Sequence, residues 1–274
     1  MIRILTLVEN TTREQRLRSK HGLSLYVETP RHKLLFDLGP NSLFAENAEK
    51  LGVDVAAVDT VVISHGHRDH GGGLGHFLAL NTKAKIYVQN SAFEPYYTRV
   101  LGMPHPIGLD VAHRNHPQVV RLDGNLQLDE ELAICTGATG RELFPSQNAS
   151  LLARVKGEMV PDDFRHEQYL TVRDGQHYVL FSGCSHNGVL NILKCHEECY
   201  GTLPTHLIGG FHQYNPTSGK TESEERVQQL AQRLATTDLL YYTCHCTGPK
   251  AYHQMQEKMG HQLAYLSVGD EIFI

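Results

Sequence analysis

Four residues whose side chains commonly bind metals fall within six consecutive positions, 65–70, where the chain reads His-Gly-His-Arg-Asp-His. An apolar run at 61–63 comes directly before this segment, and three glycines follow it at 71–73. Because side chains alternate along a strand, a strand that ends here would deliver His65 and His67 to one side of a turn. Asp69 and His70 would reach a second point nearby. The segment therefore predicts two adjacent metal positions at a strand end, and an exposed His-rich loop is the non-functional alternative.

The donor atoms of this segment limit the choice of metal. Imidazole and carboxylate together suit Zn²⁺, and also Mn²⁺ or Fe²⁺. Two metals a few ångströms apart can share one water and activate it for attack. We therefore expect two divalent metal ions as cofactors, with Zn²⁺ favoured and Mn²⁺ or Fe²⁺ as alternatives.

The pattern His65-x-His67-x-Asp69-His70 after a hydrophobic strand resembles the signature of the metallo-β-lactamase superfamily. Later segments resemble a narrower branch, the dihydropterin ribofuranosylaminobenzene 5'-phosphate synthase-like proteins. These segments are Gly-Cys-Ser-His-Asn-Gly at 183–188, Gly-Gly-Phe-His at 209–212 and Cys-His-Cys-Thr-Gly at 244–248. The resemblance extends over essentially the whole chain. It implies the α/β fold of the superfamily, a four-layer αββα sandwich, as a single domain over residues 1–274.

Hydrophobic periodicity predicts the same architecture. Short β-branched runs indicate strands at 2–8, 23–28, 34–37, 60–64, 85–89, 119–122, 132–135, 169–173, 178–182, 206–209, 239–243 and 263–268. Helical patterns cover 42–51, 74–80, 188–200, 223–235 and 249–259. Two stretches, 93–117 and 137–166, show no regular pattern. We expect them to be long loops that frame a substrate pocket.

The resemblance implies two groups of metal ligands. His65, His67 and His186 would hold one metal, and Asp69, His70 and His245 would hold the other. Around His186 the chain departs from the general pattern, since it lacks the His-Thr-x-Gly segment that usually supplies the third ligand. It also carries Cys184 where a bridging Asp is usual. Cys184 could be a thiolate ligand or a buried small residue, and the second reading is preferred.

Three further residues are expected near the site. The resemblance implies that Asp37 supports the metal loop through hydrogen bonds and does not bind metal; a plain turn Asp is the alternative. Glu167 could be a ligand, a supporting partner of a ligand, or a solvated acid. His212 follows a strand through two glycines, and we expect it to act as general acid to the leaving group or as a donor to an oxyanion. A surface His is the alternative for His212.

These residues predict a metal-dependent hydrolase in which a metal-bound hydroxide attacks an ester, phosphoester or related small molecule. Asp69 would both ligate metal and orient the water, and His212 would assist the leaving group. A transferase that displaces diphosphate from a dihydropterin-type substrate is the first alternative, because the branch name implies it. A non-catalytic metal-binding or sensor protein is the second, and di-iron redox chemistry on the same fold is the third.

Composition narrows the partners and the compartment. The net charge of −5 argues against nucleic acid or an anionic membrane as partner. No apolar run approaches the roughly 20 residues of a membrane span, and the N-terminal segment does not resemble a signal peptide. The six cysteines are too sparse for a secreted disulfide scaffold, so we expect reduced thiols in the cytoplasm. Cys195 and Cys199, four apart in a predicted helix, could hold metal but are expected to have no role. The oligomeric state stays open.

Overall fold

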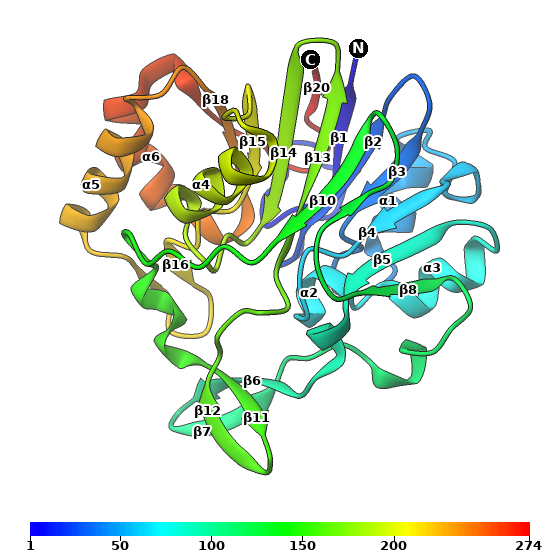
Figure 1. Cartoon of the computed structure of the whole chain (residues 1–274), viewed down its shortest axis with the longest axis horizontal. Helices are drawn as coiled ribbons and strands as arrows, with labels where there is room; N and C mark the ends of the chain where they lie inside the picture. The colour runs from blue at the N-terminus through cyan, green and yellow to red at the C-terminus, as the bar shows by residue number, and fades with distance from the viewer.

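The computed structural model describes residues 1–274 and contains two seven-stranded sheets packed face to face (Figure 1). The first sheet runs in the order β20 (Glu271–Phe273), β1 (Arg3–Val8), β2 (Ser24–Glu28), β3 (Lys33–Phe36), β4 (Thr60–Val62), β5 (Lys85–Gln89) and β8 (Val119–Leu122). The second runs in the order β19 (Leu263–Tyr265), β18 (Leu240–Thr243), β15 (His206–Gly209), β14 (His177–Gly183), β13 (Gln168–Asp174), β10 (Leu132–Thr136) and β9 (Leu126–Gln127).

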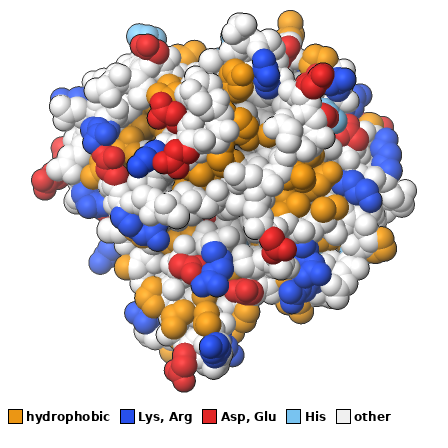
Figure 2. All heavy atoms as spheres, viewed as in Figure 1, with side chains coloured by type: hydrophobic (Ala, Val, Ile, Leu, Met, Phe, Trp, Pro, Cys, Tyr) orange, Lys and Arg blue, Asp and Glu red, His pale blue; other side chains and the backbone are white.

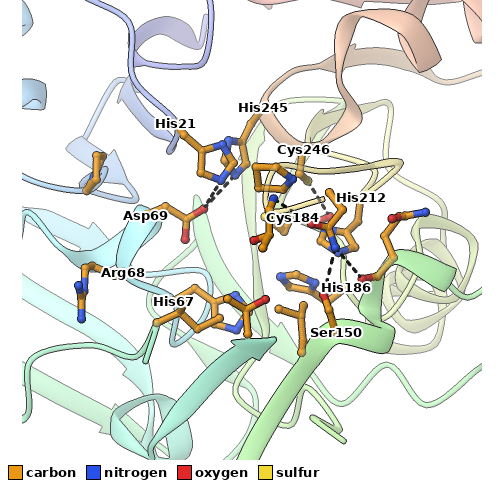
Figure 3. Close-up of a pocket in the computed structure, with 18 of the residues that line it drawn as sticks. His21, His67, Arg68, Asp69, Ser150, Cys184, His186, His212, His245 and Cys246 are labelled. Atoms are coloured by element: carbon orange, nitrogen blue, oxygen red, sulfur yellow. Dashed lines mark hydrogen bonds and ion pairs between the residues drawn. The ribbon is translucent and has the colours of Figure 1, made fainter. Parts of the chain in front are cut away.

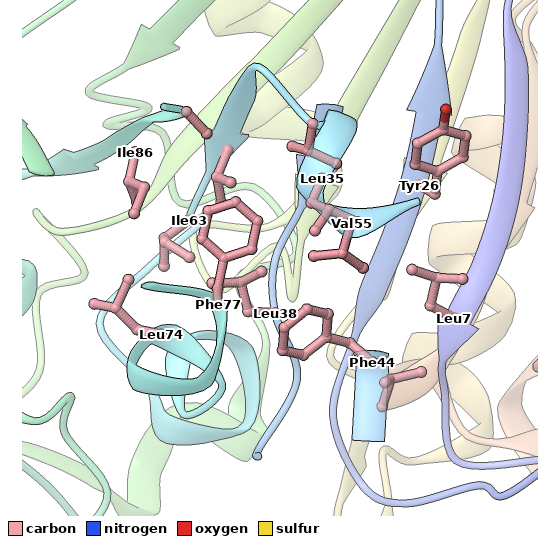
Figure 4. Packing of buried hydrophobic residues seen from close by; sticks show 14 of the residues in the cluster. Leu7, Tyr26, Leu35, Leu38, Phe44, Val55, Ile63, Leu74, Phe77 and Ile86 are labelled. Atoms are coloured by element: carbon pink, nitrogen blue, oxygen red, sulfur yellow. The ribbon is translucent and has the colours of Figure 1, made fainter. Parts of the chain in front are cut away.

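Helices cover the outer face of each sheet. On the first sheet these are α1 (Leu43–Lys50) and α3 (Leu74–Leu80), and on the second they are α4 (Val189–Tyr200), α5 (Glu224–Leu234) and α6 (Pro249–Met259). Three buried apolar clusters match this layering: one on each helix-covered face and one between the sheets. Figure 4 shows the first, in which Phe44 and Phe77 from the helices pack against Leu35, Ile63 and Ile86. The predicted αββα sandwich is confirmed.

The direction of the strands gathers the chemistry at one edge. β3 and β4 are parallel in the first sheet, and β14, β15 and β18 are parallel in the second. The carboxyl ends of parallel strands meet at one edge of a sheet, where α/β proteins place their sites. The residues that follow these five strand ends include, in order, Asp37, His65, His186, His212 and His245.

The segments 93–117 and 137–166 are not the irregular loops that we expected. They form a four-stranded antiparallel sheet in the order β12 (Glu158–Pro161), β11 (Leu151–Val155), β6 (Tyr96–Val100) and β7 (Met103–Pro106). Figure 1 shows this sheet projecting below the two main sheets. β7 is exposed along its whole length and contains Pro104 and Pro106, so its sequence lacks the alternation that marks a half-buried strand.

The other predicted helices and strands all occur, most with ends within two residues of the prediction. The exception is the strand predicted at 263–268, which ends at Tyr265. β9, β20 and the short hairpin of β16 (Tyr214–Asn215) and β17 (Lys220–Thr221) were not predicted.

Figure 2 shows acidic and basic side chains interspersed on the visible face, with apolar side chains among them on the projecting sheet. None of the helices has both the length and the apolar character that crossing a membrane requires.

Candidate metal centre

The first group of predicted ligands, His65, His67 and His186, lies together at the site edge. Their ring centroids are 4.6 to 4.9 Å apart. The Nε2 atom of each ring is buried and has no hydrogen-bond partner. On the other side of two of the rings, the His65 Nδ1 lies 2.8 Å from Ser64 Oγ and the His186 Nδ1 lies 3.0 Å from Asn148 Oδ1. Buried polar atoms are seldom left unpaired, so three orphaned imidazole nitrogens fit a metal ion.

The second group, Asp69, His70 and His245, is equally close. The Nε2 atoms of His70 and His245 lie 3.2 Å apart. The Asp69 Oδ2 lies 3.3 Å from the His245 Nε2 and 3.7 Å from the His70 Nε2. Each ring is fixed through Nδ1, by Asp37 for His70 and by Asn10 for His245. Two imidazole nitrogens and a carboxylate oxygen suit Zn²⁺, Mn²⁺ or Fe²⁺.

Cys184 lies between the two groups. Its Sγ is 3.1 Å from the His70 Nε2. The sulfur lies within 4.8 Å of the ligand atoms of His65 and His186, and equally within 4.8 Å of those of His70 and His245. This position, beside both groups and facing the cavity, favours the ligand alternative for Cys184 over the preferred reading of a small core residue.

Asp37 positions one ligand of each group. Its Oδ2 accepts hydrogen bonds from His70 Nδ1 at 2.6 Å and from Ser64 Oγ at 2.8 Å, and its Oδ1 accepts one from the Ser64 amide at 2.7 Å. The same Ser64 hydroxyl contacts His65 Nδ1. Asp37 is fully buried and is held at a φ of +62°. These contacts match the supporting role implied by the resemblance. They exclude the alternative in which Asp37 is only a turn residue.

Glu167 supports the His186 loop. Its carboxylate accepts hydrogen bonds from the His186 amide at 2.6 Å, the Asn187 amide at 3.0 Å, the Asn187 side chain at 2.9 Å and the Tyr169 hydroxyl at 2.8 Å. Burial raises the pKa of Glu167, and these donors oppose the rise. The solvated acid is therefore wrong, and four donors occupy both oxygens, so the geometry favours the supporting role over that of a ligand.

His212 faces the same space. It is only 6% exposed, neither ring nitrogen has a hydrogen-bond partner, and its ring centroid lies 4.3 Å from that of His186. Its backbone has a φ of +48°, which is unusual for a residue with a Cβ. The surface alternative is wrong. Figure 3 shows His212 on the side of the cavity opposite Asp69.

Sequence reasoning missed several residues around His245 and Asp69. The His21 Nε2 lies 3.2 Å from the Asp69 Oδ2. Burial alone would lower the pKa of His21, but the Asp69 carboxylate raises it. Buried Glu9 accepts a hydrogen bond from the His245 amide at 2.7 Å, and Asn10 contacts both the ring and the carbonyl of His245. The polar pair Glu9-Asn10 after the first strand was the one signal for these contacts; nothing in the sequence indicated His21.

A second missed pair lies beside His67. Buried His166 accepts a hydrogen bond from the Gly66 amide at 2.9 Å, and its Nε2 lies 3.0 Å from Asp162 Oδ2. The same Asp162 oxygen is 3.7 Å from the His67 Nε2. Burial alone would raise the pKa of Asp162, but His166 and His67 hold it below its ordinary value. Both residues lie in the segment predicted as a loop, where no pattern marked them.

A cavity of about 310 Å³ opens beside the ligands. Such a volume suits a small molecule. The metal loop lines one side with Arg68 and Asp69, and the projecting sheet lines another with Thr98, Pro106 and Leu151. The prediction that 93–117 and 137–166 frame a pocket is therefore confirmed, although part of this frame consists of strands and not of loops.

Comparison with known proteins agrees with this geometry. The family model of the metallo-β-lactamase superfamily matches residues 19–140, which include the loop at 65–70. A crystal structure of Tm1679, described as a metal-dependent hydrolase of the β-lactamase superfamily, superposes with a TM-score of 0.84. The two chains are 25% identical, and the match covers 100% of this chain and 99% of that one. The chain therefore has the metallo-β-lactamase fold.

Two relatives of this metallo-β-lactamase-fold chain come from Methanocaldococcus jannaschii. The uncharacterized protein MJ0448 is 25% identical over 263 residues, which cover 94% of each chain. The 7,8-dihydropterin-6-methyl-4-(beta-D-ribofuranosyl)-aminobenzene-5'-phosphate synthase is 24% identical over 271 residues, which cover 92% of this chain and 89% of the synthase. The resemblance to the synthase-like branch is thus confirmed as a similarity.

Replacing Asp37 by Asn tests the supporting shell. Asn tolerates a positive φ and keeps the volume, but it removes the charge that faces His70. We expect metal affinity to fall about 10- to 100-fold, measured by competition with a chelator. Asp54→Asn, which retains a helix cap outside the site, is the matched control and should bind metal as wild type does. Unchanged affinity in Asp37→Asn would contradict the role given to this carboxylate.

Proposed function

We propose that this chain is a dinuclear metal-dependent hydrolase of a small-molecule ester, phosphoester or related electrophile. The observation that carries the proposal is the pair of buried donor groups whose free nitrogens lie beside one cavity. His65, His67 and His186 would hold one ion. Asp69, His70 and His245 would hold the other, with Cys184 between them. Zn²⁺ is favoured because a thiolate suits it, and Mn²⁺ or Fe²⁺ remain compatible with the other donors.

When bound, two such ions supply Lewis acidity and lower the pKa of a coordinated water from 15.7 to about 7. The chain's own contribution begins with Asp69. Burial alone would raise the pKa of Asp69, but His70, His21 and His245 hold it well below its ordinary value. Asp69 therefore stays ionised at neutral pH and can accept a hydrogen bond from the attacking water, which orients that water toward the cavity.

His212 would act on the other side of the substrate. Its two unpaired ring nitrogens face the space beside His186, across the cavity from Asp69 (Figure 3). A protonated ring can donate to the oxygen of the leaving group as the bond breaks, and a neutral ring can donate to a developing oxyanion. This arrangement supports separate roles for the two residues: Asp69 orients the nucleophile and His212 assists departure.

The lining of the cavity bears on the substrate. Arg68 is the one Lys or Arg side chain among the lining residues, and Gln147, Asn215 and Thr217 add neutral donors and acceptors. Outside the metal positions, the cavity therefore offers few partners for a second strongly anionic group. We infer a substrate with one anionic or electrophilic group, such as a phosphoester, attached to a neutral polar body.

A transferase is the second candidate, favoured by the similarity to the synthase from M. jannaschii. The same two metal positions would then neutralise a departing diphosphate. A carbon or nitrogen atom of a second substrate would replace water as nucleophile. Asp69 would then have no water to orient, whereas the assistance from His212 to the leaving group would be retained.

A chromogenic panel tests the proposed reaction. We expect metal-loaded wild type to hydrolyse at least one of bis(p-nitrophenyl) phosphate, p-nitrophenyl phosphate and p-nitrophenyl acetate. His67→Ala should lose metal, by elemental mass spectrometry, and activity together, by about 100-fold or more, because an open coordination site weakens both binding and chemistry. His253→Ala replaces an exposed His on α6; it is the control and should match wild type.

Stoichiometric metal in His67→Ala would contradict the ligand assignment. Release of diphosphate from a dihydropterin diphosphate, only when an amine or carbon nucleophile is added, would favour the transferase.

His212→Ala separates the leaving-group role from metal binding. We expect this variant to keep its metals and to lower kcat about 10²- to 10⁴-fold on alkyl esters, whose leaving groups need a proton. The loss should be much smaller on p-nitrophenyl esters, whose leaving group departs without one. Equal losses on both substrates would contradict the general-acid role, and loss of metal would make His212 a ligand.

A further inference from the structure

A second group of potential metal ligands lies outside the proposed active site. Cys135 is on β10, and Cys195 and Cys199 lie one turn apart on α4. The three sulfur atoms all lie within 4.8 Å of one another, and those of Cys135 and Cys195 are 3.4 Å apart. None of the three lines the active-site cavity. Helix packing has therefore brought together three thiols that the proposed hydrolase does not use.

The spacing of the sulfurs matches that of a metal site. Three thiolates bound to one Zn²⁺ at about 2.3 Å stand about 4 Å apart, so the observed group needs only small side-chain movements. Cys135 and Cys195 are buried, whereas Cys199 is exposed and leaves the group open to solvent on one side. An ion could therefore reach the sulfurs without unfolding of the helix.

One neighbouring side chain is aimed at the sulfur group. The Asn125 side chain donates a hydrogen bond to Cys199 Sγ at 3.4 Å and accepts one from the Thr136 amide at 2.9 Å, which fixes its orientation. The hydrogen bond between the sulfurs lowers the pKa of the Cys195 thiol and raises that of Cys135, and burial raises the pKa of Cys199, so a bound cation is needed to hold all three as thiolates. Donors aimed at sulfur are the usual support of a thiolate ligand.

We propose that Cys135, Cys195 and Cys199 form a separate site for one thiophilic d¹⁰ metal ion, Zn²⁺ or Cu⁺. Three thiolates satisfy the soft Cu⁺ ion by themselves, and a solvent molecule on the Cys199 side would complete the four ligands of Zn²⁺. A disulfide between Cys135 and Cys195 would use only two of the sulfurs. It would not account for the third thiol or for the Asn125 side chain that donates to it.

An ion bound by these three cysteines would cross-link β10 to α4. Both elements support the proposed metal centre, because Thr136 on β10 donates a hydrogen bond to the Glu167 carbonyl at 2.8 Å and α4 begins directly after the His186 loop. Occupancy of the thiol site would therefore stabilise the segment that presents His186.

Metal counting on matched variants tests this site. Reduced, chelator-treated protein is titrated with Zn²⁺ and, separately, with Cu⁺ under reductant, desalted and analysed by elemental mass spectrometry. Wild type should bind one equivalent more than Cys199→Ala and than Cys195→Ser. The control Glu198→Ala, an exposed neighbour on the same helix, should bind as wild type. The proposed active-site ligands, Cys184 included, are unchanged in all four proteins, so that site contributes equally.

Stability gives a second readout. Saturating Zn²⁺ should raise the Tm of wild type by about 5 °C more than that of Cys199→Ala. Equal stoichiometry and equal Tm gain in wild type and Cys199→Ala would overturn the proposal. So would a Cys135–Cys195 disulfide, found by peptide mapping, in protein whose reduced form binds no additional ion. Neither result depends on hydrolytic activity.

Discussion

The hydrogen bonds of the buried Asp37 carboxylate fix both halves of the proposed metal centre. This one side chain holds His70 directly and holds His65 through Ser64. A buried carboxylate is strongly unfavourable unless donors surround it, and Asp37 has three donors at 2.6 to 2.8 Å. Because β3 runs parallel to β4, the residue after β3 lies beside the metal loop that follows β4. The positive φ of Asp37 then turns its side chain into that loop.

The second requirement is a constant separation between the two sheets, since each supplies residues of the proposed metal centre. Gln168 on β13 bridges the two sheets. Its backbone amide donates to the Ser64 carbonyl at 2.8 Å, and its side-chain Nε2 donates to the Ile63 carbonyl at 2.8 Å. Glu9, just after β1, reaches across to the His245 amide. The apolar layer between the sheets brings them together, and these polar bridges set the relative position of His65 and His245.

The sandwich and the residues gathered at the candidate metal centre could be predicted from the sequence, because both leave local signals. The loop at 65–70 concentrates four donors after an apolar strand, and His186, His212 and His245 each follow a predicted strand. Non-local contacts left no such signal. The fold brings His21, His166 and Asp162 to the site from segments without periodicity, and the projecting sheet includes β7, which is exposed along its whole length. Cys184 could be placed but not given a role, because its distance from His70 depends on how the two sheets pack.

The central claim is that two ions are held by ligands from both sheets, and metal content tests it most directly. The measurement is elemental mass spectrometry of as-purified protein with and without His186→Ala, both in a Cys199→Ala background so that the thiol group adds nothing. We expect near two equivalents of Zn, Mn or Fe in the parent and a fall of about one equivalent in the His186 variant. One equivalent or none, unchanged by the mutation, would contradict the dinuclear centre.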